Sequence, residues 1–171
     1  MKNSKNDYVI TFKGLELGSH DFEFEAGDRF FEEKGAEDFR KGKVNVHVEM
    51  IKETTMLVLN FDLKGSVEVA CDRCLEKYDQ QLEGKFRLIV KFGEETGEMS
   101  DELVVIPHEE YQLDLSQFIY EYIVLMLPIK HVHPDDENGH STCNQDMIDR
   151  LENMTIKSDM RWDALKNIKL D

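Results

Sequence analysis

Alternation of apolar and polar residues is the dominant pattern in the first half of the chain. In residues 44–50 every second position is apolar, which is the period of a half-buried strand. The same period returns at Leu57 and keeps one parity as far as Cys71, which predicts a single long strand with a bend or bulge at Gly65. Apolar residues then occupy even positions within 78–92, so we expect a returning strand and a long hairpin.

The strongest helical pattern begins in the second half of the chain. Asp114 as N-cap, with Gln117 three residues later, matches a capping box, and Pro128 ends the segment. Val124 and Leu125 widen the apolar stripe, so we expect this helix to be mostly buried against the sheet. The stripe consists of residues at helical spacing, namely Leu115, Phe118, Ile119, Tyr122, Ile123 and Met126.

Three cysteines bring chemistry into this picture. Cys71 and Cys74 are separated by two residues at the expected hairpin tip, and Cys143 follows in a loop rich in histidine. A thioredoxin-like redox pair should open a helix, but a strand pattern resumes by Tyr78, so the spacing favours zinc. A closed tetrahedral zinc site takes four ligands, and three cysteines therefore require one histidine.

The identity of the fourth ligand stays open on spacing alone. His140 precedes Cys143 by three residues, so both side chains could face one ion. His133 is held between a valine and a proline shortly after the helix, and His131 points away from it if the segment is extended. Spacing alone therefore does not choose among His131, His133 and His140.

These elements together predict one α+β domain over residues 1–171. We expect a mainly antiparallel β-sheet, one long packed helix, short C-terminal helices and a zinc-knuckle-like loop. Its parts are N-terminal strands with a short helix at 1–42, a long hairpin or meander at 43–92, an acidic loop with an edge strand at 93–112, and a helix, Cys/His loop and tail at 113–171.

Composition narrows the class of function. The chain has 171 residues, 40% hydrophobic and 33% charged, which is typical of a globular protein. Its longest apolar stretch, residues 118–127, is too short to span a bilayer, and the N-terminus has no apolar signal core. Three cysteines favour a reducing compartment, so we expect a cytoplasmic protein without a membrane partner.

The net charge is −15, which disfavours binding of nucleic acid through the overall charge of the domain. The same charge favours a basic protein partner. The stretch from 93 to 112 has seven acidic residues and no lysine or arginine. The acidic side chains that we expect to face such a partner are Glu94, Glu95, Glu98, Asp101 and Glu102.

Two other classes of function remain open. An RNA-binding module could use a local basic face, because the guanidinium groups of Arg73 and Arg161 and the indole of Trp162 can stack on bases. A thiol-dependent enzyme could use Cys143 with a nearby histidine, either in redox chemistry or as a nucleophile. The sequence has no phosphate loop, no nucleophile elbow and no His-Glu-x-x-His helix, so we expect neither catalysis nor a small-molecule substrate.

Several motifs together resemble a known family. The turn reads Cys-Asp-Arg-Cys-Leu at 71–75, an Asp-Leu-led helix runs from 114 to a Leu-Pro at 127–128, and Val132-His133 and Cys143 follow. The tail reads Asp-Met-Arg-Trp-Asp-Ala-Leu at 159–165. In their order and spacing over roughly residues 40–170, these motifs resemble the YceD family, the large ribosomal RNA subunit accumulation proteins.

The resemblance implies a small bacterial or plastid protein without enzymatic activity that is needed for normal accumulation of 23S ribosomal RNA. The gene of such proteins often lies beside that of a large-subunit ribosomal protein. Together with the acidic net charge, the resemblance favours a ribosomal protein or a pre-50S particle as the partner, with possible indirect contact with rRNA. Many relatives carry a cysteine where this chain has His133, which points to His133 as the fourth zinc ligand. The chain departs from the family at His131 and Met160, where prolines are common.

Overall fold

The computed structural model describes residues 8–36, 39–94, 97–100 and 102–154. The chain divides into two compact units. The larger comprises Met1–Val69 and Asp79–Ile129, and the smaller comprises Ala70–Tyr78 and Lys130–Asp171. Among the described residues, the larger unit contains two sheets and two helices, and the smaller contains the tip of a long hairpin, a loop and one helix.

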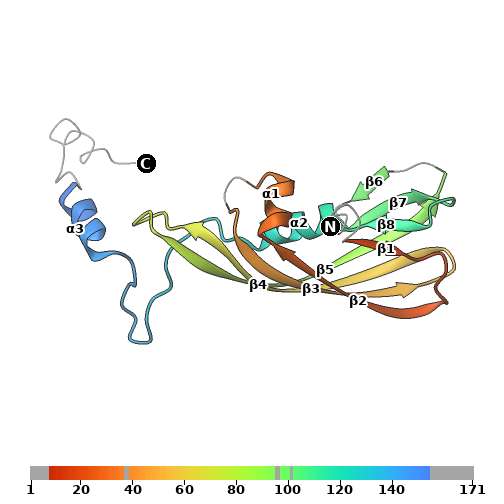
Figure 1. The fold of residues 1–171 in the computed structure, drawn as a ribbon, viewed down its shortest axis with the longest axis horizontal. Helices are drawn as coiled ribbons and strands as arrows, with labels where there is room; N and C mark the ends of the chain where they lie inside the picture. The colour runs from red at the N-terminus through yellow and green to blue at the C-terminus, as the bar shows by residue number, and fades with distance from the viewer. Residues whose placement is uncertain (1–7, 37–38, 95–96, 101, 155–171) are drawn as a thin grey trace, which may run out of the picture. The chain divides into compact units, whose positions relative to one another are not determined.

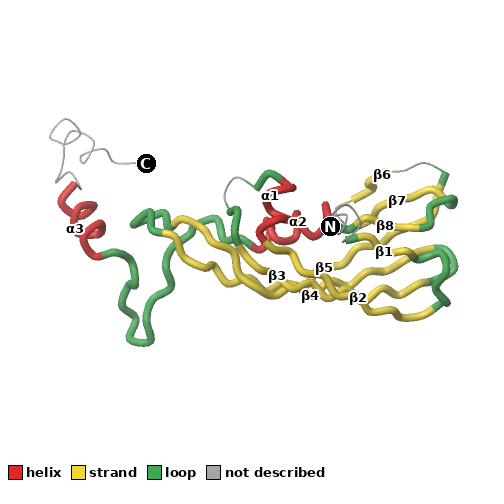
Figure 2. Tube along the Cα trace, viewed as in Figure 1, coloured by secondary structure: helices red, strands yellow, loops and turns green. Residues whose placement is uncertain are grey.

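A six-stranded sheet is the main element of the larger unit (Figures 1 and 2). The strands follow the order β2 (Gly18–Gly27), β3 (Gly42–Lys52), β4 (Met56–Ala70), β5 (Lys77–Gly93), β7 (Leu103–Pro107) and β6 (Gly97–Ser100). Neighbours pair antiparallel from β2 to β4 and between β7 and β6, whereas β5 and β7 are parallel. A second, two-stranded sheet pairs β1 (Val9–Thr11) with β8 (Gln112–Asp114).

Two helices, α1 (Asp28–Lys34) and α2 (Ser116–Met126), lie on the same side of the main sheet (Figure 1). The inward residues of the strands and helices form the core, including Phe31, Leu59, Leu63, Ile119 and Ile123, which are almost fully buried. Burial of each such side chain stabilises the fold by about 1.5–3 kcal/mol. The predicted α+β class with a mainly antiparallel sheet and one packed helix is therefore confirmed.

The prediction for the acidic segment was wrong in two respects. Residues 97–100 form β6 rather than loop, and β7 lies between β5 and β6 rather than at the sheet edge. Strand pairing satisfies backbone groups whatever the side chains are, so a polar, glycine-containing segment can still close an otherwise open edge. Composition alone therefore missed this strand.

The predicted capping box at the start of α2 was also wrong. The helix begins at Ser116 with Leu115 as its N-cap, because Asp114 belongs to β8 and pairs with Val9. The Asp114 carboxylate still stabilises the start of α2, since its Oδ1 accepts a hydrogen bond of 2.8 Å from the backbone N–H of Ser116. The apolar stripe is narrower than expected, because the side chain of Leu125 is 70% exposed.

Gly65 does not mark a bulge in the pairing of β4 with β3. The register between β3 and β4 is continuous from Gly42↔Val67 to Lys52↔Leu57, with Gly65 opposite Val44. A Cβ atom at Gly65 would overlap the carbonyl oxygen of Lys43 and lie 2.6 Å from the Cα of Val44. The glycine is therefore required for close approach of two backbones within a regular ladder.

We predict that Gly65→Ala destabilises the protein by about 1–3 kcal/mol, because backbone atoms must shift to admit the new methyl group. Gly14→Ala is the matched control, since a Cβ there meets no atom within 4 Å. Urea unfolding monitored by circular dichroism gives both free energies. Equal unfolding midpoints for the two variants would contradict the close-approach explanation.

Candidate metal centre

The turn between β4 and β5 places two cysteines at the hairpin tip. The backbone N–H of Leu75 donates to the carbonyl of Cys71, and the N–H of Cys71 donates to the carbonyl of Glu76, both at 2.9 Å. Leu75 adopts a φ of 62°, a left-handed conformation that is uncommon for a residue with a side chain. This tight turn brings the thiols of Cys71 and Cys74 into one buried cluster.

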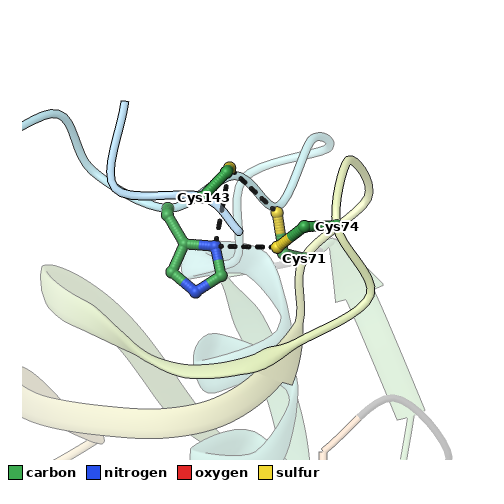
Figure 3. A group of neighbouring side chains, drawn as sticks. Cys71, Cys74 and Cys143 are labelled. Carbon is green, nitrogen blue, oxygen red and sulfur yellow. Dashed lines mark hydrogen bonds between the residues drawn. The ribbon is translucent and has the colours of Figure 1, made fainter. Parts of the chain in front are cut away.

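The loop after α2 supplies the other two donors. Cys71, Cys74, His133 and Cys143 each offer one ligand atom, and these four atoms all lie within 4.8 Å of one another. The Cys71 and Cys143 sulfurs are 3.7 Å apart, and His133 Nδ1 lies 3.5 Å from the Cys74 sulfur and 3.7 Å from that of Cys143 (Figure 3). Four separate sequence positions thus converge within the smaller unit.

These spacings fit a tetrahedral zinc ion. Bonds of about 2.3 Å to sulfur and about 2.0 Å to nitrogen imply tetrahedron edges of about 3.5–3.8 Å. All three cysteines are free, and a sulfur separation of 3.7 Å is well beyond the roughly 2.05 Å of a disulfide. The donor set could therefore bind a metal such as zinc, with His133 presenting Nδ1.

A backbone pairing positions His133. The N–H of Asp72 donates to the carbonyl of His131, and the carboxylate of Asp72 accepts from the N–H of His131, both at 2.7 Å. The ring of His133, two residues further on, packs against Tyr78 with ring centroids 4.7 Å apart. Asp72 and Tyr78 thus orient a candidate ligand, a role that the motif spacing gave no sign of.

The segment after Cys143 packs against the candidate metal centre. Helix α3 (Gln145–Met154) starts after Asn144, whose Oδ1 accepts a hydrogen bond of 3.3 Å from the N–H of Met147. The amide of Asn144 also donates to the carboxylate of Glu76 at 2.6 Å, which ties the helix start to the hairpin tip. Apolar side chains pack against the three thiols, namely Tyr78, Val132, Met147 and Ile148.

The pKa values of the thiols in the cluster favour binding of a cation. Burial raises the pKa of the Cys71 thiol, but backbone N–H groups of Cys74, Arg73 and His133 outweigh it and lower that pKa to about 6. Cys143 responds differently: a hydrogen bond with Ser141 lowers its pKa, but burial and the neighbouring Cys71 thiolate together leave it raised. Negative charge on Cys71 thus opposes ionisation of Cys143, and a bound cation would remove that opposition.

His140, the alternative fourth ligand, lies apart from the cluster. Its side chain is 79% exposed, and its Nδ1 lies 3.5 Å from the carboxylate of Asp136. Asp136 also accepts from the backbone N–H groups of Asn138 and His140, which folds this part of the loop on itself. The structure thus brings His133, and not His140, to the three cysteines.

The residues predicted to contact partners are scattered over the chain. Arg73 is exposed on the hairpin tip, and Glu94 and Glu102 are exposed at the ends of the acidic segment. The described residues do not include Glu95, Asp101, Arg161, Trp162 or the side chain of Glu98. They also do not include residues 161–168, which we expect to form one of the short C-terminal helices. No helix in the described part of the chain is long and apolar enough to cross a membrane.

The fold and centre define an α+β protein with a Cys₃His cluster at the tip of a hairpin. The model of the YceD family, described as Large ribosomal RNA subunit accumulation protein YceD, matches residues 59–169. The chain therefore belongs to the YceD family, as the sequence motifs indicated. Neither a curated protein nor a solved structure matches the chain significantly.

We predict that Cys71 is alkylated before Cys143 when chelator-treated protein meets iodoacetamide at pH 7. At that pH a thiol with a pKa of about 6 is mostly thiolate, and its reactivity should fall as the pH drops through 6. Trypsin cuts after Arg73, so mass spectrometry can follow each cysteine on a separate peptide. Faster modification of Cys143 would show that the N–H groups around Cys71 do not stabilise its thiolate.

Proposed function

We propose that this protein is a non-enzymatic factor that supports accumulation of 23S ribosomal RNA during assembly of the large ribosomal subunit. The family match carries the proposal, because it spans the hairpin tip, α2, the ligand loop and the tail. The family name refers to large ribosomal RNA subunit accumulation. We further propose a cytoplasmic, bacterial protein that acts by binding rather than by catalysis.

The donor set supports a structural role for zinc. Cys71, Cys74, Cys143 and His133 supply four protein ligands, and a four-ligand tetrahedral site leaves no open position for a substrate or water. Zinc would cross-link the hairpin tip to the loop after α2. Since the ligands come from two distant segments, the metal would compensate the ordering entropy of the loop.

Charge supports a basic partner. A net charge of −15 disfavours direct contact with phosphates and favours the lysine- and arginine-rich surface of a ribosomal protein or a precursor particle that displays one. The exposed carboxylates of Glu94 and Glu102 flank β6 at one edge of the main sheet. We propose that this acidic face speeds encounter with the partner.

We predict about one zinc ion per chain in protein purified without chelators. His133→Ala should lower zinc content measured by elemental analysis and lower the unfolding temperature, whereas His140→Ala should leave both close to the parent values. The two substitutions are matched because both histidines lie in the same loop. Absence of zinc from every preparation, or a greater loss in His140→Ala, would refute this ligand assignment.

We predict that neutralising Glu94, Glu95, Glu98, Asp101 and Glu102 together weakens co-sedimentation with large-subunit precursors in sucrose gradients. Higher salt should weaken binding of the parent in the same way, because both reduce attraction between opposite charges. A matched control neutralises the same number of acids elsewhere, at Glu16, Glu23, Glu32, Glu53 and Asp79, which are all exposed. Equal co-sedimentation and equal 23S rRNA levels in parent and both variants would limit the acidic face to solubility.

A salt-dependent association with naked RNA would instead favour the RNA-binding alternative. Arg73 is exposed at the hairpin tip beside the candidate metal centre, where its guanidinium could stack on a base. Arg73→Ala should then weaken RNA binding and reduce its salt slope. The proposed protein partner requires the opposite result, with Arg73→Ala having no effect on precursor binding.

A further inference from the structure

The C-terminal end of α2 leaves apolar side chains uncovered. Leu125 is 70% exposed and Val124 is 41% exposed, although both lie on the helix that packs against the main sheet. They border a hollow of about 480 Å³ in the larger unit. One acidic residue and no lysine or arginine line this hollow in the described part of the chain. The lining residues are Ser100, Val104, Phe118, Tyr120, Glu121, Tyr122, Val124 and Leu125.

A second hollow of about 760 Å³ adjoins the first, since Tyr122 and Leu125 line both. Its charged lining is acidic in balance, with four carboxylates against Lys85 and Arg87. The carboxylates are those of Asp21, Glu49, Asp62 and Glu102. The two hollows together offer an apolar floor beside a surface that attracts cations.

Two buried polar atoms beside these hollows have no hydrogen-bond partner among the described residues, the hydroxyl of Tyr122 and Oδ1 of Asp62. Tyr122 is only 6% exposed, and its ring stacks on Phe86 at a centroid distance of 4.4 Å while meeting Phe61 edge-on. Burial, followed by the charges of Glu121 and Glu102, raises the pKa of Tyr122 to about 12, so its hydroxyl keeps its proton and can donate.

An unpartnered buried hydroxyl is costly, and native proteins rarely keep one without a reason. Here the ring is fixed by two aromatic neighbours, so it cannot easily turn to find an acceptor elsewhere in the fold. The other oxygen of the Asp62 carboxylate is 3.2 Å from Lys85 Nζ, which leaves Oδ1 as a free acceptor. The Tyr122 hydroxyl thus lacks an acceptor, and Asp62 Oδ1 lacks a donor.

From this arrangement we infer that the two hollows, which share Tyr122 and Leu125 in their linings, are the docking site of a basic peptide segment that inserts apolar side chains beside α2. The lysine or arginine side chains of the segment meet Asp62 and Glu102 at the surface. The side chains that cover the buried Tyr122 hydroxyl move aside, so that a backbone carbonyl of the segment accepts from it. The inference rests on the proposed basic partner and gives that partner a site and a binding mode.

Charge complementarity selects this occupant. A second copy of the chain would bring another net charge of −15 to an acidic surface, and RNA would bring phosphates to it. A basic segment gains from both features, since its apolar side chains cover Leu125 and its cations neutralise the rim. Ser100 lines the first hollow and Glu102 lines the second.

The test is fluorescence anisotropy of the full chain with a short labelled peptide rich in lysine that carries leucines one helical turn apart. Two matched probes replace the leucines with serine or the lysines with glutamate. We expect binding of the first probe only. Leu125→Ser should weaken it about tenfold or more through lost apolar contact, whereas Leu17→Ser, which alters a leucine of 65% exposure elsewhere, should not.

Tyr122→Phe separates binding from stability. Removal of an unpartnered hydroxyl should leave the unfolding temperature unchanged or higher, but it should weaken probe binding about fivefold. Lower stability with unchanged affinity would overturn the assigned hydrogen bond. Equal binding of the leucine and serine probes, or equal losses in Leu125→Ser and Leu17→Ser, would overturn the site.

Light scattering and co-sedimentation separate the remaining outcomes. If Leu125→Ser turns a dimer into a monomer, a second copy covers this surface and the inference is wrong. If Leu125→Ser protein still co-sediments fully with large-subunit precursors, this site is wrong while the proposed function stands. Failure of the parent protein to co-sediment would instead overturn the proposed function, and probe binding would then be judged by the anisotropy alone.

Discussion

The confinement of three thiols and one imidazole within a few ångströms is the constraint on which the hairpin tip and its loop depend. Three buried sulfurs cannot all ionise beside one another without a cation, and the N–H groups around Cys71 already favour its thiolate. The Asp72–His131 pairing brings the loop to the hairpin before any metal bond is counted. Zinc would then fix an arrangement that the backbone has prepared, which is how metal binding contributes folding energy.

Much of the fold could be predicted because its strands bury one face, which imposes a two-residue period on β3, β4 and β5. The failed predictions depend on tertiary pairing: β6 is polar, and Asp114 lies in β8, so it is not the N-cap residue of α2. The three cysteines were visible in the sequence, but spacing could not separate His133 from His140 because loop geometry decides between them. Asp72 gave no signal, since an exposed aspartate in a turn is ordinary.

The two units provide different properties for one proposed role. The smaller unit carries a closed cluster suited to holding a loop, and nothing in such a cluster requires turnover of a substrate. The larger unit carries an acidic rim and an uncovered apolar helix end, which suit recognition of a basic partner. The chain belongs to the YceD family, whose name refers to large ribosomal RNA subunit accumulation, and both features are compatible with the role that we propose.

X-ray absorption at the zinc K-edge tests the central claim most directly, because it reports the donor atoms around the metal without requiring activity. The account predicts three sulfur neighbours at about 2.3 Å and one nitrogen neighbour at about 2.0 Å in the purified full chain. In His133→Ala the nitrogen should be lost or replaced while the sulfurs remain. A spectrum dominated by oxygen and nitrogen neighbours, or one unchanged in His133→Ala, would contradict the Cys₃His centre.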